Sequence, residues 1–132
     1  MAIFLNMNNP TIDKISRRLK AISDPTRIKI LLLLFRKECC VCELTGAIGL
    51  SQPTISRHLS LLEREGFISS TREKNWIIYR ISPMETCCRQ LLDVVLNRAR
   101  KDPEAEKLMD KVSGLDRCSI SQDKEIERKA AK

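Results

Sequence analysis

Three thiols lie within four residues, flanked by two carboxylates, in the segment Glu38-Cys39-Cys40-Val41-Cys42-Glu43. Thiolates are the ligands that select soft, thiophilic ions, and they are also the groups that oxidants modify. A single cysteine most often serves as a small buried hydrophobic side chain, but three so close together between glutamates fit that role less well. The segment therefore predicts a metal, metalloid or redox site, with core packing as the alternative.

The remaining cysteines are the vicinal pair Cys87-Cys88 and Cys118 near the end of the chain. Residues 1–5 lack the basic region and the long apolar stretch of a signal peptide. The longest apolar run, residues 30–35, is far shorter than the roughly 18 to 20 residues that cross a bilayer. We therefore expect a cytoplasmic protein with no membrane partner, in which the six cysteines are thiols available for ligation rather than structural disulfides.

Two predicted helices precede the thiol cluster. Apolar residues recur at helical spacing over residues 12–22 with basic residues between them, which predicts an amphipathic first helix. The Asp24-Pro25 pair offers an N-cap and a first-turn proline for a second helix, which ends near Arg36-Lys37. The apolar face of this second helix is expected to join a core.

A helix-turn-helix pattern comes directly after the cluster. Residues 44–48 mark a short helix that Gly49 ends, and Ser51 caps a longer helix that ends at Gly66. The longer helix carries an apolar stripe at i, i+4 and i+7, formed by Ile55, Leu59 and Leu62. Residues off this stripe are free to meet DNA, and with the cap they form the predicted contact set of Ser51, Gln52, Thr54, Ser56, Arg57 and His58.

A β-hairpin and another helix complete the predicted fold. Residues 67–70 and 76–81 are typical of strands, and the charged tip between them places Arg72 and Lys74 for DNA backbone contacts. A helix from about residue 84 to 100 presents a broad apolar face that suits a second subunit. We predict a mainly α winged helix-turn-helix domain with a small antiparallel hairpin over residues 1–101, dimerising through its N- and C-terminal helices. Residues 102–132 are expected to form a mobile tail with one short helix over 104–112.

Charge favours a nucleic-acid partner over an enzymatic role. The formal charge is +7, and residues 1–101 carry 17 Lys and Arg against 9 Asp and Glu. Basic side chains that contact phosphates release counterions and supply most non-specific affinity for DNA. No paired carboxylates, phosphate loop or nucleophile-base arrangement indicates an enzyme, and the Cys39-x-x-Cys42 spacing lacks the βαβ setting of a thiol oxidoreductase.

Four segments in order resemble the ArsR/SmtB family of winged-helix metalloregulators, over about residues 19–83. They look most like the arsenic-responsive ArsR branch and comprise Asp24-Pro25-Thr26-Arg27, Cys40-Val41-Cys42-Glu43-Leu44, the helix at 50–62 and the wing return at 76–83. The resemblance implies a dimeric repressor that needs no cofactor for DNA binding. It is expected to hold an inverted-repeat operator in double-stranded DNA, with Gln52 on adenine and Arg57 on guanine. As(III) or Sb(III) is the implied inducer.

The implied arsenic site needs three sulfur ligands, and this chain departs from the branch at the third. Cys40 and Cys42 match the first two ligands, but Thr45 stands where the branch has another cysteine. Cys39 is the nearest substitute: on a regular helix it would share a face with Cys42, whereas Cys40 and Cys42 would point about 200° apart. Closing all three on one ion would therefore distort the segment and displace the recognition helix. The alternative ligands are Cys87, Cys88 and Cys118.

Other sensors on the same fold remain open. A redox-responsive repressor would oxidise Cys39 and Cys42, or Cys87 and Cys88. A cadmium- or lead-responsive repressor would need a fourth thiolate, for which Cys87 or Cys88 of a partner subunit is available. A multi-histidine zinc sensor is disfavoured because His58 is the only histidine in the sequence.

Overall fold

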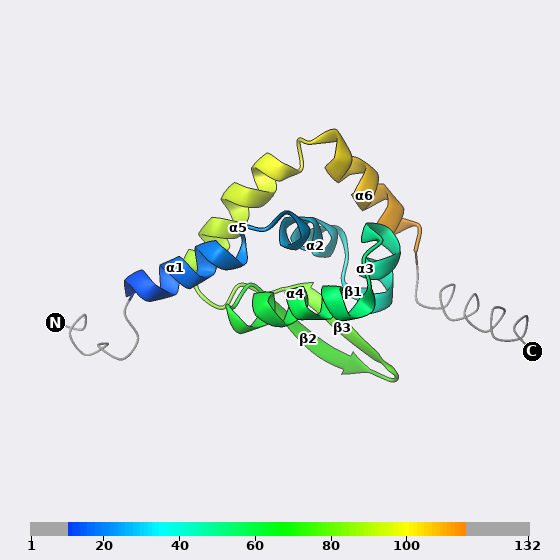
Figure 1. Ribbon diagram of the computed structural model, residues 1–132, viewed down its shortest axis with the longest axis horizontal. Helices are drawn as coiled ribbons and strands as arrows, with labels where there is room; N and C mark the ends of the chain where they lie inside the picture. The colour runs from blue at the N-terminus through cyan, green and yellow to red at the C-terminus, as the bar shows by residue number, and fades with distance from the viewer. Residues whose placement is uncertain (1–10, 116–132) are drawn as a thin grey trace, which may run out of the picture.

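The computed structural model describes residues 11–115 and confirms a winged helix-turn-helix fold that is mainly helical (Figure 1). Its elements are α1 (Thr11–Ala21), α2 (Pro25–Arg36), β1 (Cys39–Cys40), α3 (Val41–Ile48), α4 (Gln52–Arg64), β2 (Ile68–Glu73), β3 (Trp76–Ile81), α5 (Thr86–Ala99) and α6 (Pro103–Ser113). Helix α2 runs through the centre, between α5 and α6 on one side and α4 with the hairpin on the other. Within this described part, no helix is long and apolar enough to cross a membrane.

Local capping signals place the helices where the sequence predicts them. The Asp24 carboxylate accepts a hydrogen bond from the Arg27 backbone N–H at 3.0 Å and so caps α2. Ser51 caps α4 in the same way. Helix α3 ends at Gly49, whose φ of 86° lies in the left-handed region that suits glycine. Gly49 and the Ser51 cap together set the tight turn between α3 and α4.

The sheet has one more strand than the predicted hairpin. Strand β1 pairs antiparallel with β3, which also pairs with β2, in the order β1-β3-β2. Strand β2 extends to Glu73, so the turn of the hairpin shortens to Lys74-Asn75, with Lys74 in the left-handed region at φ 54°. The extra strand forms because the buried backbone between α2 and α3 must find hydrogen-bond partners, and the free edge of β3 supplies them.

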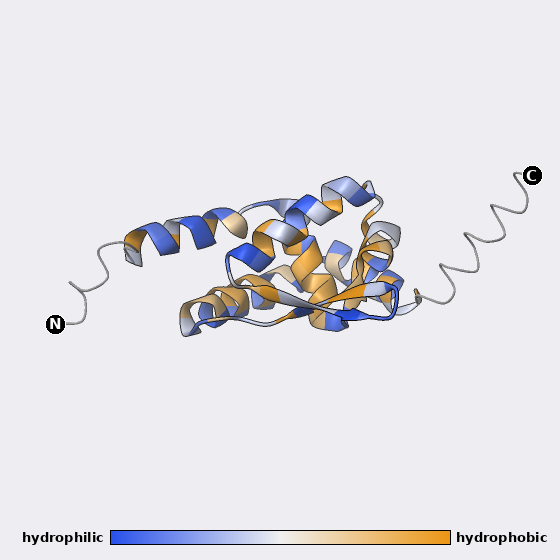
Figure 2. Ribbon diagram, turned by 90° about the horizontal axis from the view of Figure 1, so that it is seen from below, coloured by the Kyte–Doolittle hydropathy of each residue, from blue (hydrophilic) through white to orange (hydrophobic). Residues whose placement is uncertain are grey.

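The core lies beneath α2 and the apolar stripe of α4. Ile55, Leu59 and Leu62 are fully buried, as their spacing predicts, and they belong to the same core as Ile30 and Phe67. Figure 2 shows the apolar residues gathered between the helices, while the tip of the hairpin is hydrophilic. Burial of this stripe fixes which face of α4 remains outside.

The packed fold continues beyond residue 101, where a mobile tail was predicted to begin. Helix α6 covers the predicted short helix at 104–112 and packs against α2 and α3, with Ala105 and Val112 buried in the core. An ion pair of 3.1 Å between Lys29 and Glu104 also ties it to α2. Ala105 and Val112 are thus brought against α2 and α3 only when the chain folds. Residues 116–132, Cys118 among them, lie outside the described part.

Candidate functional site

The thiol cluster does not form one helical surface. Cys39 and Cys40 make up β1, paired with Tyr79 and Ile78 of β3, and only Cys42 lies within α3. The comparison of the three thiols on a regular helix therefore does not apply to Cys39 and Cys40. Successive side chains of a strand point to opposite faces, so Cys39 and Cys40 are directed apart by the backbone itself.

Cys39 takes the packing role that the sequence left open. Its side chain is 0% exposed and belongs to the hydrophobic core, and its Sγ donates to the Lys37 carbonyl oxygen at 3.3 Å. Cys39 as third ligand stays a prediction, but its thiol would have to leave the core to meet the others.

Cys40 caps α3 together with a buried carboxylate. The Glu43 Oε1 accepts from the Cys40 backbone N–H at 3.0 Å, and the Cys40 side chain faces the Glu43 backbone N–H, which completes a capping box. Glu43 is only 1% exposed, and its Oε2 lies 2.6 Å from the Lys37 Nζ. The sequence contains the signal for this arrangement, because Cys40-x-x-Glu43 has the spacing of a Ser-x-x-Glu capping box.

The pKa values of the two capping groups are shifted in opposite directions. Burial raises the pKa of the Cys40 thiol to about 11, and the neighbouring Glu43 carboxylate adds to this rise. Burial alone would raise the pKa of Glu43 as well, but the hydrogen bonds from Lys37 and from Cys40 outweigh it and hold that pKa below its ordinary value. At neutral pH the site therefore holds a carboxylate beside a protonated thiol.

Cys42 lies in the first turn of α3 and is half-buried. Thr45 follows it at i+3, on the same side of the helix. The Thr45 Oγ1 is a buried atom without a hydrogen-bond partner in the described part of the protein. An unsatisfied buried hydroxyl is uncommon in folded proteins, so the Thr45 hydroxyl costs free energy at this position without a compensating hydrogen bond.

The second cysteine pair occupies the start of α5, away from the cluster. Cys88 is buried, and its Sγ donates to the Glu65 carbonyl oxygen at 3.7 Å, at the end of α4. Cys87 is half-buried, and its side chain is one of the groups that raise the pKa of Arg18. Over residues 11–115, no three His, Cys, Asp or Glu side chains come together as a metal site. Among the described residues, the predicted cysteine ligands are therefore not arranged as a three-ligand metal site.

The predicted DNA-contacting residues divide by exposure. Ser51, Gln52 and Arg57 on α4 are exposed, and so are Arg72 and Lys74 on the wing. The others, Thr54, Ser56 and His58, are half-buried. The Ser51 and Thr54 hydroxyls also hydrogen-bond each other at 2.8 Å. The exposed residues of α4 and the wing therefore carry most of the surface that can meet a nucleic acid.

Arg27 connects the recognition helix α4 to the end of α1, a role that sequence reasoning missed. Its Nη1 lies 3.1 Å from the His58 Nδ1. Its Nε and Nη2 donate to the carbonyl oxygens of Ala21 (2.5 Å) and Lys20 (3.1 Å). His58 thus faces the protein body rather than standing free on the outer face of α4. Only the tertiary fold brings these side chains together.

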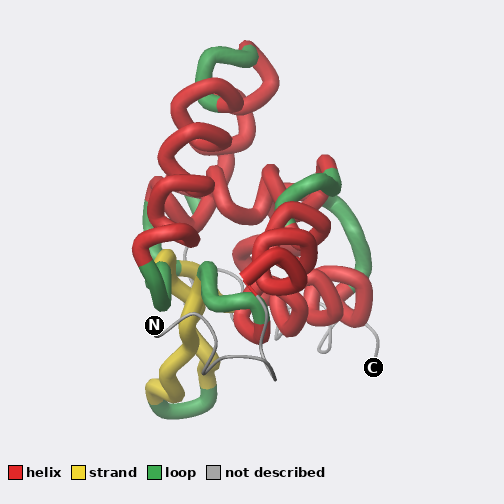
Figure 3. Tube along the Cα trace, turned by 90° about the vertical axis from the view of Figure 1, so that its left-hand side faces the viewer, coloured by secondary structure: helices red, strands yellow, loops and turns green. Residues whose placement is uncertain are grey.

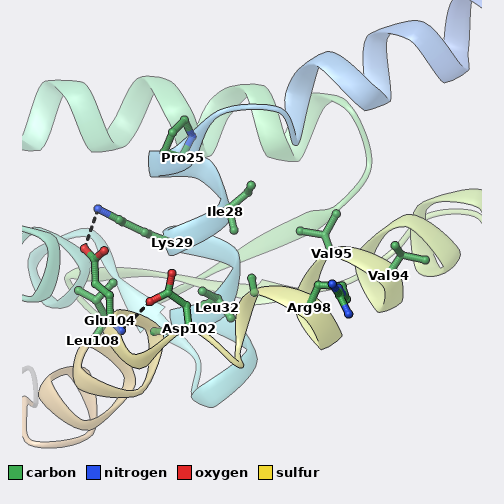
Figure 4. A pocket seen from close by; sticks show the side chains of 12 residues that line it. Pro25, Ile28, Lys29, Leu32, Val94, Val95, Arg98, Asp102, Glu104 and Leu108 are labelled. Carbon is green, nitrogen blue, oxygen red and sulfur yellow. Dashed lines mark hydrogen bonds and ion pairs between the residues drawn. The ribbon is translucent and has the colours of Figure 1, made fainter.

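A hollow of about 730 Å³ between α2, α5 and α6 lies apart from the thiols (Figure 4). Its lining is mainly apolar and includes Ile28, Leu32, Val95 and Leu108, and no cysteine borders it. It therefore offers no sulfur ligand and is not part of the thiol site.

Comparisons with known proteins identify the family. The profile described as "Bacterial regulatory protein, arsR family" matches residues 24–70, which span the second helix, the thiol cluster, the helix-turn-helix and the start of the wing. An arsenic resistance transcriptional regulator of Pseudomonas putida is 40% identical over 79 residues, covering 58% of this chain and 69% of that protein. The chain belongs to the ArsR family.

Two further proteins are similar to this chain, one in sequence and one in fold. A second arsenic resistance transcriptional regulator of Pseudomonas putida is 48% identical over 65 residues, covering 48% of this chain and 51% of that protein. The match thus spans about half the length of that relative. A homodimeric winged helix-turn-helix DNA-binding domain of Mycobacterium bovis superimposes with a TM-score of 0.59 at 29% identity, covering 68% of this chain and 82% of that one. ArsR-family proteins are transcriptional regulators and not enzymes.

Proposed function

We propose that this ArsR-family chain is a homodimeric repressor that holds an inverted-repeat operator and releases it when As(III) or Sb(III) binds Cys40 and Cys42. The observation that carries the proposal is the place of these thiols at the N-cap and in the first turn of α3. Helix α3 packs on α4, the recognition helix. Any ligand that draws the two sulfurs together acts directly on the helix that supports DNA reading.

The proposed ligation balances without an oxidant. Arsenous acid, As(OH)₃, exchanges a hydroxyl group for each thiol sulfur, and each thiol proton leaves with that hydroxyl as water. Arsenic remains trivalent throughout. Binding at Cys40 takes its sulfur from the capping box of α3, and loss of an N-cap costs about 0.5–2 kcal/mol. This range overlaps the coupling of about 1–3 kcal/mol that is typical of allosteric proteins and lowers affinity roughly 5- to 150-fold.

A redox mechanism at the same cluster draws less support from the geometry. The redox sensor at this cluster would oxidise Cys39 together with Cys42, and oxidants reach accessible thiols. Cys39 is 0% exposed and packed in the hydrophobic core, so its thiol would have to leave the core to react.

Operator binding under different inducers tests the proposal. The full chain would be titrated, by fluorescence anisotropy, onto inverted-repeat DNA that it selects from a randomised pool. With a phosphine reductant in excess, arsenite and antimonite are expected to release the DNA, whereas zinc is not. Release only by peroxide would instead establish the redox sensor. Release by cadmium or lead but not by arsenite would establish the four-thiolate alternative.

Arg57 and Lys74 are expected to contribute differently to DNA binding. Arg57→Ala should weaken operator binding by about 1–3 kcal/mol and relax the preference for one base, because Arg57 is exposed on the outer face of α4. Lys74→Asn should weaken binding to every sequence and lower the salt slope by about 1. Asparagine suits this control because it tolerates the left-handed backbone of Lys74. If Arg57→Ala and Lys74→Asn changed sequence specificity equally, the assignment of Arg57 to the bases and of Lys74 to the DNA backbone would be wrong.

The proposed dimer uses the exposed apolar face of α1. Ile12 is 80% and Leu19 is 47% exposed on this helix, which projects from the body of the molecule (Figure 2) and toward the viewer in Figure 3. Val94 of α5, at the rim of the hollow between α2, α5 and α6, is 65% exposed. Replacing Ile12 and Leu19 with glutamate should yield a folded monomer with little operator affinity, as measured by sedimentation and anisotropy. If the variant remained a dimer, the interface would have to lie elsewhere than on α1.

A further inference from the structure

We infer that Arg27 is a positioning residue for DNA binding, which fixes the ring of His58 so that its Nε2–H group donates to a phosphate of the DNA backbone. The inference rests on the proposed operator binding and deepens it by naming one contact, its acceptor and the residue that prepares it. Arg27 and His58 are 31 positions apart in the sequence, so only the folded chain brings them together.

The guanidinium of Arg27 is held in place at the end of α1. Its Nε donates to the Ala21 carbonyl oxygen at 2.5 Å, and its Nη2 donates to the Lys20 carbonyl oxygen at 3.1 Å. Both carbonyls belong to the last turn of α1, where the last carbonyls of a helix attract a cation. Two of the three nitrogens of the planar guanidinium are thus fixed, and the third, Nη1, lies 3.1 Å from the His58 Nδ1.

This contact determines which nitrogen of the imidazole carries the hydrogen. A guanidinium has only donors, so the His58 Nδ1 must be the acceptor and cannot carry a hydrogen. A neutral imidazole has one N–H group, which therefore lies on Nε2. A ring protonated on both nitrogens would direct an N–H at the guanidinium and lose the hydrogen bond. Arg27 thus sets His58 as a neutral donor through Nε2.

The Nε2 nitrogen of His58 is open to a partner outside the fold. Over residues 11–115, the one hydrogen bond of the His58 side chain is the contact with Arg27. In this same part of the chain, the buried side-chain nitrogen or oxygen that lacks a partner is the Thr45 Oγ1. The Nε2 nitrogen is therefore accessible rather than enclosed. A donor that is fixed in direction and unused by the protein is available to a ligand.

His58 lies on the flank of α4 rather than on its outer face. Successive residues of a helix are about 100° apart. Arg57 is exposed and marks the outer face, Leu59 is buried and marks the inner face, and the half-buried His58 lies between them. In the major groove the outer face of a recognition helix meets the base edges, whereas its flanks meet walls lined by phosphate oxygens. A phosphate is therefore the acceptor that this place favours.

Two substitutions at His58 separate the roles of its two nitrogens. In His58→Asn, the amide oxygen takes the place of Nδ1 and can accept from Arg27, but no donor remains at the place of Nε2. In His58→Gln, the amide nitrogen takes the place of Nε2 and keeps that donor. Anisotropy on the full chain and its selected operator should show at least about 10-fold weaker binding for His58→Asn. His58→Gln should bind nearly as the parent protein does, and equal losses in the two variants would overturn the inference.

Sequence and salt dependence identify the acceptor and the charge of the ring. The loss in His58→Asn should be the same for operator and unrelated DNA, because a phosphate carries no sequence information. The slope of log affinity against log salt should match that of the parent protein, because a neutral donor releases no counterion. A loss confined to one base pair would overturn the phosphate contact, and a lower salt slope would overturn the neutral ring.

A double-mutant cycle tests whether Arg27 acts through His58. Arg27→Lys keeps the positive charge, but an ammonium cannot serve three acceptors in the plane of a guanidinium. This change should weaken DNA binding about 3-fold or more in the parent protein and add little loss in His58→Asn. A role of Arg27 in the fold alone would weaken both proteins by the same factor, and that result would overturn the positioning role.

The free protein allows a direct measurement of the ring. His58 is the only histidine in the sequence, so the imidazole nitrogen NMR signals of the untagged protein need no assignment. At neutral pH the parent protein is expected to carry a hydrogen on Nε2 and none on Nδ1. A hydrogen on Nδ1 would overturn the inference whatever the affinities are. A parent protein that selects no DNA from the randomised pool would instead overturn the proposed operator binding, which separates the two failures.

Discussion

A protein carrying both Cys40→Ser and Cys42→Ser is expected to bind its operator like the parent protein and to ignore arsenite. Serine is among the best N-cap residues, and its hydroxyl oxygen can accept from the Glu43 backbone N–H as a capping box requires. The start of α3 should therefore survive the change. The two sulfurs are lost, and with them the roughly 5- to 150-fold drop in operator affinity that a typical inducer causes.

Anisotropy titrations with and without arsenite measure this effect, and Cys87→Ser with Cys88→Ser is the matched control. Those residues form an adjacent pair at the start of another helix, so the control removes the same number of thiols. The control protein should respond to arsenite like the parent. Arsenite release that persists in the Cys40→Ser, Cys42→Ser protein but disappears in the control would move the inducer site to α5.

Glu43→Ala is expected to destabilise the fold by about 1–3 kcal/mol, the cost of leaving a buried hydrogen-bond donor, the Cys40 backbone N–H, without its partner. Glu43 is 1% exposed and receives both the Lys37 ammonium and the Cys40 backbone N–H. Its loss leaves the ammonium without its carboxylate and the N-terminus of α3 without half of its cap. Urea unfolding followed by circular dichroism, at one protein concentration throughout, measures the change.

Glu38→Ala provides the comparison for Glu43→Ala, because both glutamates flank the same cysteines. Glu38 is exposed, and its 3.1 Å ion pair with Arg80 lies at the surface. Such a pair contributes about 0–1 kcal/mol. Similar losses of stability in the two variants would contradict the buried role assigned to Glu43.

The sequence alone determined the elements whose signals are local. The Asp24-Pro25 cap, the Ser51 cap, Gly49 and the stripe of Ile55, Leu59 and Leu62 each act within a few residues. Hydrogen bonds and side-chain spacing of this range are visible in the order of residues, which explains why the helix-turn-helix and the buried stripe of its longer helix were predicted correctly.

Only the tertiary structure decided how the cysteines are used. Cys39 pairs with Tyr79 across the sheet, and Lys37 bonds to Leu115 at the far end of the fold. Contacts between positions so distant in sequence leave no periodic pattern, because they depend on how separate elements pack. They placed Cys39 and Cys40 in a strand, buried Cys39 in the core, and brought Leu115, just after α6, against Gly46 of the helix that carries Cys42.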